Sequence, residues 1–217
     1  MKKLSAILFM VPAISLAHNV PDNIKIVPLK NMGFPVKIKK EMQSYNDIQK
    51  QNGYVQSDNT YTRKLLLMRS NTMRFLKSDD PAEQELKKSL SEIPLNFKYK
   101  NNVPNTIAYT ALGLETKEGW SGIKIFFDGK EIGTCELSVF NIANANQPMQ
   151  LNEDGLTYDV NDKPTRINIE GSHNSGFMYS VRWYDKNFVH ELQCANLTYD
   201  KRITEKIIVL ANTIDKG

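Results

Sequence analysis

The chain has 217 residues, of which 41% are hydrophobic and 24% are charged, and its formal net charge at pH 7 is +4. A chain of this length and composition can bury the core of an ordinary globular domain without external crosslinks. The charge balance is too even for the strong basic stripe of a nucleic-acid-binding protein, so we expect no nucleic-acid partner.

Residues 1–17 have the pattern of a secretory signal peptide. Two lysines precede an apolar stretch, and Ser15 and Ala17 supply the small side chains that a signal peptidase reads. The apolar stretch is shorter than the roughly 20 residues of a transmembrane helix, and no longer one follows. We therefore expect cleavage after Ala17, no transmembrane segment, and a periplasmic or secreted bacterial protein.

Residues 18–35 are rich in proline, which removes backbone donors and disfavours helix, so they predict an extended N-terminal segment. A helical segment is predicted over 36–95, where apolar residues recur every three or four positions. Its first helix starts at Val36 and ends before Gly53.

Two further helices are predicted in the same segment. The second spans about 60–77 and carries five basic residues, Arg63, Lys64, Arg69, Arg74 and Lys77. The third has Asp80 as its N-cap and Pro81 at its first position, and it ends before Pro94. Such a segment is too small to fold securely alone, so we expect it to pack on the rest of the chain.

Beyond Pro104 the apolar residues alternate with polar ones, which is typical of β-strands. Roughly seven or eight short runs separated by turn residues predict an antiparallel β-sandwich over 104–217. The last segment, 203–214, fits either a helix or a strand, and its β-branched residues favour a strand. The predicted fold class is α+β, an N-terminal helical segment followed by a disulfide-bridged antiparallel β-sandwich.

The two cysteines, Cys135 and Cys194, predict a disulfide because an even number of cysteines in an exported chain usually pairs. Both share the alternation phase of apolar neighbours, so we expect a bridge inside the core, between facing sheets. A crosslink that closes a loop of roughly sixty residues stabilises a fold by about 4 kcal/mol.

Sequence motifs of enzymes are missing from the chain. It has no G-x-S-x-G, no glycine-rich phosphate loop and no paired C-x-x-C. His190-Glu191 begins like a zinc-binding H-E-x-x-H motif, but the second histidine is absent. Catalysis is therefore not the favoured hypothesis, although hydrolases whose carboxylates meet only in the fold also lack short motifs.

A copper site is the alternative hypothesis, because signal cleavage would place His18 at the N-terminus. An N-terminal histidine can chelate copper through its amine and Nδ1, and His173 would supply the second imidazole. In this one respect His18 resembles the first residue of mature lytic polysaccharide monooxygenases and of some periplasmic copper carriers. The resemblance implies a copper redox enzyme or carrier.

The favoured hypothesis is a non-catalytic binding or assembly protein of the bacterial envelope that recognises a protein or a glycan. Trp120 lies between glycines and is a candidate stacking platform for a ligand, although a core position is the simpler interpretation. The basic helix near 60–77 is a candidate for peripheral contact with an anionic membrane.

Overall fold

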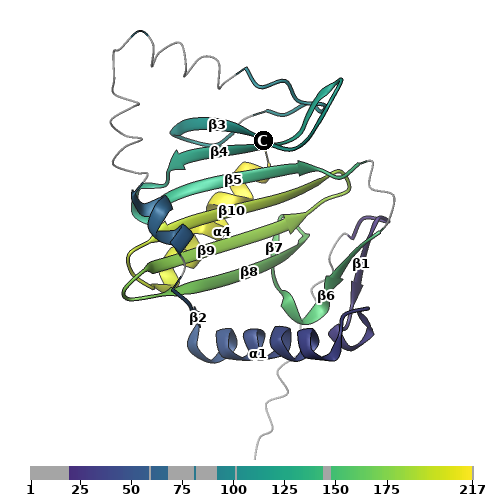
Figure 1. The fold of residues 1–217 in the computed structure, drawn as a ribbon, viewed down its shortest axis with the longest axis vertical. Coiled ribbons are helices and arrows are strands. Elements are labelled where there is room, and N and C mark those ends of the chain that lie inside the picture. Colours follow the sequence, from purple (N-terminus) through teal and green to yellow (C-terminus); the bar gives the residue numbers. More distant parts are fainter. Residues whose placement is uncertain are drawn as a thin grey trace, which may run out of the picture.

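The structure is a computed structural model that describes residues 20–58, 60–67, 81, 92–100, 102–143 and 148–216. An eight-stranded sheet forms its centre, in the order β2-β8-β9-β10-β5-β4-β3, with β7 paired to β8 (Figure 1). Only the short β2 runs parallel to its neighbour. The strands are β2 (Val55–Gln56), β3 (Thr106–Thr116), β4 (Gly119–Asp128), β5 (Thr134–Asn141), β7 (Leu156–Val160), β8 (Lys163–Ser172), β9 (Gly176–Tyr184) and β10 (Phe188–Asn196).

The inner face of this sheet carries the main core and is covered by the C-terminal helix α4 (Lys201–Asp215) (Figure 1). Alternate residues of the central strands point to this face, among them Leu137, Val181 and Leu192, which lie opposite one another in register. Ile207 and Ala211 of α4 are fully buried against them. The apolar residues that alternate along the strands thus pack on the apolar side of one amphipathic helix.

Three other elements cover the outer face. At one end, the helical stretch 60–67 packs its fully buried Leu65 on Met178 and Ala195. At the other end, the parallel ribbon of β1 (Ile24–Val27) and β6 (Met149–Asn152) packs on Tyr184 and Val189. Between these two apolar contacts the outer face is a strip of polar and charged side chains.

Helix α1 (Val36–Asn52) lies along the β8 side of the sheet, and it ends at Gly53 in a left-handed conformation, as the sequence predicts (Figure 1). Its Gln49 bonds to the backbone of β8, donating to the carbonyl of Ile167 and accepting from the N–H of Ile169, both at 2.8 Å. These backbone groups lie between the stretches of β8 that pair with β7 and with β2. The side-chain amide of Gln49 therefore makes the two hydrogen bonds that a neighbouring strand would make at this edge.

The disulfide between Cys135 and Cys194 is confirmed. Its position differs from the prediction, because the two cysteines lie directly opposite each other on the neighbouring strands β5 and β10. The bridge therefore joins two strands of one sheet, and the expectation that it connects facing sheets is wrong. Alternation correctly placed both cysteines in the core, where each is fully buried.

The α+β class, with an N-terminal helix and a disulfide-bridged antiparallel sheet, is confirmed. The preference for a strand over 203–214 is wrong, because this segment belongs to α4. Asp200 caps the helix by accepting a hydrogen bond from the N–H of Arg202. Packing of one apolar stripe on the sheet outweighs the low helix propensity of the β-branched residues.

Candidate functional site

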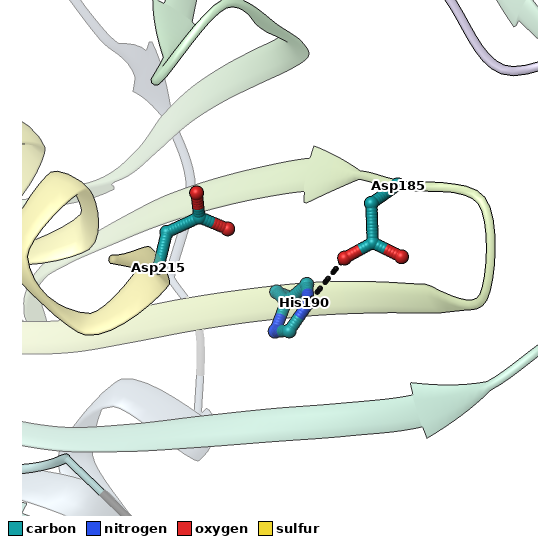
Figure 2. Close-up of side chains that lie close together, drawn as sticks. All are labelled: Asp185, His190 and Asp215. Atoms are coloured by element: carbon teal, nitrogen blue, oxygen red, sulfur yellow. Dashed lines mark hydrogen bonds and ion pairs between the residues drawn. The ribbon is translucent and has the colours of Figure 1, made fainter. Parts of the chain in front are cut away.

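Two groups of side chains stand out in the described residues. One lies on the inner face of the large sheet and the other on its outer face. The first, called here the Asp–His cluster, consists of Asp185, His190 and Asp215, whose potential ligand atoms lie within 4.8 Å of one another (Figure 2). Asp185 follows β9, His190 lies on β10, and Asp215 ends α4. The cluster thus closes the inner core where the helix meets the β9–β10 hairpin.

Asp215 accepts hydrogen bonds from three side chains. Its Oδ1 accepts from Nε1 of the buried Trp183 at 2.9 Å and from Nζ of Lys163 at 2.5 Å. Its Oδ2 accepts from Nδ2 of Asn161 at 2.9 Å. These bonds fasten the end of α4 to β9 and to the turn between β7 and β8.

Asp185 is similarly occupied. Its Oδ1 accepts from the backbone N–H groups of Asn187 and Phe188, and its Oδ2 lies 3.2 Å from Nε2 of His190. Burial raises the pKa of Asp185, but the hydrogen bonds with His190 and the backbone outweigh burial, so the pKa lies below its ordinary value. An ionised Asp185 accepts only, which assigns the proton of His190 to Nε2.

A metal ion fits this cluster poorly. Lys163 lies 2.5 Å from Asp215 and 3.7 Å from Asp185, so an ion bridging the carboxylates would have to displace its ammonium group. A metal-binding histidine usually donates from its other nitrogen, yet Nδ1 of His190 has no hydrogen-bond partner in the described residues. We interpret the cluster as a structural ion-pair network in which Lys163 supplies the cation.

The second group forms a pocket of about 270 Å³ between the outer face and the N-terminal elements, called here the arginine pocket. Arg166 and Arg182 contribute its charged wall from β8 and β9. Its remaining wall is mainly apolar and comes from the segment before α1, from α1, from the β6–β7 region and from the ends of β9 and β10. The apolar lining residues are Met32, Phe34, Met42, Met149, Leu151, Leu156, Tyr184 and Val189.

The two arginines are directly opposite each other in the register of β8 and β9. Arg182 forms an ion pair with Glu191 at 2.6 Å. Burial lowers the pKa of Arg182, but the negative charge of Glu191 outweighs it, and the pKa lies above its ordinary value. Arg166 donates from Nε to Oδ1 of Asn168 at 3.0 Å and has no ion-pair partner in the described residues.

The residues singled out in the sequence do not meet in either group. His18 lies outside the described residues, and His173 is an exposed residue in the β8–β9 turn, with its ring edge-on to Phe177. Copper binding through these two histidines therefore stays a prediction. Trp120 is half-buried near the start of β4, where its backbone pairs with residues 94–96, and ligand stacking on its ring also stays a prediction.

The basic helix predicted near 60–77 is described only over 60–67. There Leu65 is buried against the sheet, and Arg63 donates to the carbonyl of Asn174. Leu65 is thus used for internal packing, Arg63 and Lys64 are exposed, and contact of this stretch with a membrane stays a prediction. Arg69, Arg74 and Lys77 lie outside the described residues.

Sequence reasoning missed both groups. It dismissed His190 for lack of a second histidine in the motif, and it did not single out Arg166 or Arg182. Arg166 and Arg182 alternate with the apolar residues of their strands, so the sequence places both on the polar face. The register that brings them opposite each other cannot be read from a single sequence. In comparisons with protein-family models, curated proteins and solved structures, nothing matches the chain.

Proposed function

We propose that the protein is an exported, non-catalytic binding protein of the bacterial envelope and that it holds a small ligand in the arginine pocket. The pocket is the observation that supports the proposal. It lies between two layers of the fold, its wall is mainly apolar, and its charged groups converge from neighbouring strands. Small-molecule sites commonly combine these three features.

Export is supported by the signal-like residues 1–17 and by the disulfide, which persists in oxidising compartments. Among the described residues, no helix is both long and apolar enough to cross a membrane. Intact-mass measurement on protein from the periplasmic fraction tests export, and we expect a chain that starts at His18. A chain that retains residues 1–17 would contradict it.

A variant that fills the pocket tests binding. Met42 reaches the pocket from α1, so Met42→Trp should block it, whereas Ile48→Trp adds the same ring at an exposed position of the same helix. The purified protein is mixed with an organic-soluble extract of bacterial envelopes and measured by native mass spectrometry.

We expect wild type and Ile48→Trp to retain an adduct of defined mass that Met42→Trp does not retain. An adduct equally abundant in all three proteins would place the ligand elsewhere. No adduct on wild type would contradict a ligand-binding function. The folded state of each variant is checked by its unfolding transition in urea.

A further inference from the structure

We propose that the arginine pocket binds an amphipathic anion, with a carboxylate or phosphate head on Arg166 and an unbranched alkyl tail among the methionines. The inference rests on the proposed function, because it names the ligand class of the same pocket. Four observations support it: the charge balance, the chemistry of the wall, the volume of the pocket and the arrangement of donors.

The pocket has two positive charges, Arg166 and Arg182, and Arg166 has no ion-pair partner in the described residues. Like charges directly opposite each other on neighbouring strands destabilise a sheet, and Arg166 and Arg182 are such a pair. Glu191 compensates one of them. Tyr184 adds no negative charge, because a phenol is uncharged at neutral pH and burial raises its pKa further. A bound anion would compensate the positive charge of Arg166.

The donors suit an oxygen anion. The Nε of Arg166 donates to Asn168, which orients the guanidinium group, and its terminal nitrogens have no hydrogen-bond partner in the described residues. A guanidinium group can donate two parallel hydrogen bonds to a carboxylate or a phosphate. A cation would be repelled by the same group, which argues against a metal ion in this pocket.

The wall suits an alkyl chain. Met32, Met42 and Met149 line the pocket together with Leu156. Methionine side chains are unbranched and polarizable, so they adapt to a flexible apolar ligand. A neutral glycan would have to leave the hydroxyl groups on this wall without partners, which costs binding free energy.

The volume favours a short tail. The pocket, at about 270 Å³, lies just below the roughly 300–1,000 Å³ of sites that hold drug-sized ligands. A probe with a short alkyl chain is therefore suitable. We therefore choose octanoate as the probe, with octyl phosphate as the phosphate counterpart.

Isothermal titration calorimetry on the mature wild-type protein compares octanoate, octanol, acetate and octyl phosphate. We expect octanoate to bind at least about tenfold more tightly than octanol, which lacks the charge, and than acetate, which lacks the tail. The stronger of octanoate and octyl phosphate identifies the head group. If octanol binds as tightly as octanoate and Met42→Trp abolishes both, the proposed function holds and the anion inference fails. If no probe binds, the anion inference fails, and the adduct measurement on the envelope extract decides the proposed function separately.

Arg166→Gln tests the role of the arginine, and Arg202→Gln, at an exposed side chain near the start of α4 and away from the pocket, is the control for loss of one positive charge. We expect Arg166→Gln to weaken octanoate about tenfold and to leave octanol unchanged, while Arg166→Lys recovers part of the affinity. In the absence of ligand, Arg166→Gln should unfold at a higher urea concentration than wild type, because it removes the like-charge pair. A lower midpoint together with unchanged octanoate affinity would show that Arg166 only supports the fold.

Discussion

The inner and outer faces of the large sheet are made by the same strands, but they are stabilised differently. The inner face is apolar, carries the disulfide and is covered by one long amphipathic helix. The outer face has two small apolar contacts with a polar strip between them. In that strip Glu136 is fully buried, bonded to Tyr61 and 2.7 Å from Lys124. The comparison indicates that most of the core lies on the inner face, whereas the arginine pocket lies on the outer face.

Of the variants considered, removal of the disulfide is expected to lower the free energy of unfolding the most. Cys135→Ala/Cys194→Ala should lower the free energy of unfolding by about 4 kcal/mol, because the crosslink closes a loop with a sequence separation of 59. Urea unfolding of the variant and of wild type measures the difference. An unchanged midpoint would show that the bridge does not constrain the unfolded chain.

Burial on the inner face can be tested within α4. Ile207→Ala deletes a fully buried side chain and should cost about 3 kcal/mol, whereas Val209→Ala, at a position that is 66% exposed, should cost less than about 0.5 kcal/mol. Equal losses in the two variants would mean that the side of α4 that carries Ile207 does not pack on the sheet.

The polar strip of the outer face depends on charge compensation. Lys124→Met leaves Glu136 buried without its cation and should cost about 2 kcal/mol, less than for a wholly buried pair because Lys124 is partly exposed. The double variant Lys124→Met/Glu136→Gln removes both charges and keeps an acceptor for Tyr61, so it should recover more than half of the loss. A double variant as unstable as the single one would show that packing, and not charge, stabilises the strip.

The smallest effect is expected at the Asp–His cluster and depends on pH. Folding lowers the pKa of Asp185, so its ionised form adds stability above the pKa of the unfolded chain, about 3.9, and this contribution is lost as the pH falls through the lower folded value. Asp185→Asn should therefore cost about 1 kcal/mol at pH 7, and the difference from wild type should shrink below about pH 4. Unfolding curves over this range measure it, and a constant difference would contradict the assignment.

Side-chain alternation was sufficient to predict which face of each central strand is buried. Cys135 and Cys194 were placed in the core for this reason, and both are fully buried. Alternation does not reveal which strands are neighbours, so the same reasoning put the bridge between two sheets when it joins adjacent strands. Strand order depends on contacts between residues far apart in the chain, which one sequence does not display.

The C-terminal segment shows how a local preference can mislead. Ile203, Ile207, Ala211 and Ile214 repeat at helical spacing and are all buried, and Asp200 provides a capping side chain. The β-branched composition of the segment favoured a strand, because propensity scales leave out the burial that the sheet offers. The helical period was the better guide.

The candidate sites could not be predicted because both depend on register. Arg166 and Arg182 become a pair only when β8 and β9 align as they do, and Asp215 meets Lys163 only when α4 returns to the β7–β8 turn. Each residue by itself has the appearance of an ordinary solvent-facing charge.

The amide of Gln49 on β8 has two consequences beyond local bonding. By bonding to the backbone groups of Ile167 and Ile169, it closes this stretch of the β8 edge to pairing with a strand from another molecule. Met42 precedes Gln49 by about two helical turns and so lies on nearly the same side of α1. The contact that anchors α1 to the edge of the sheet therefore also holds Met42 at the wall of the pocket.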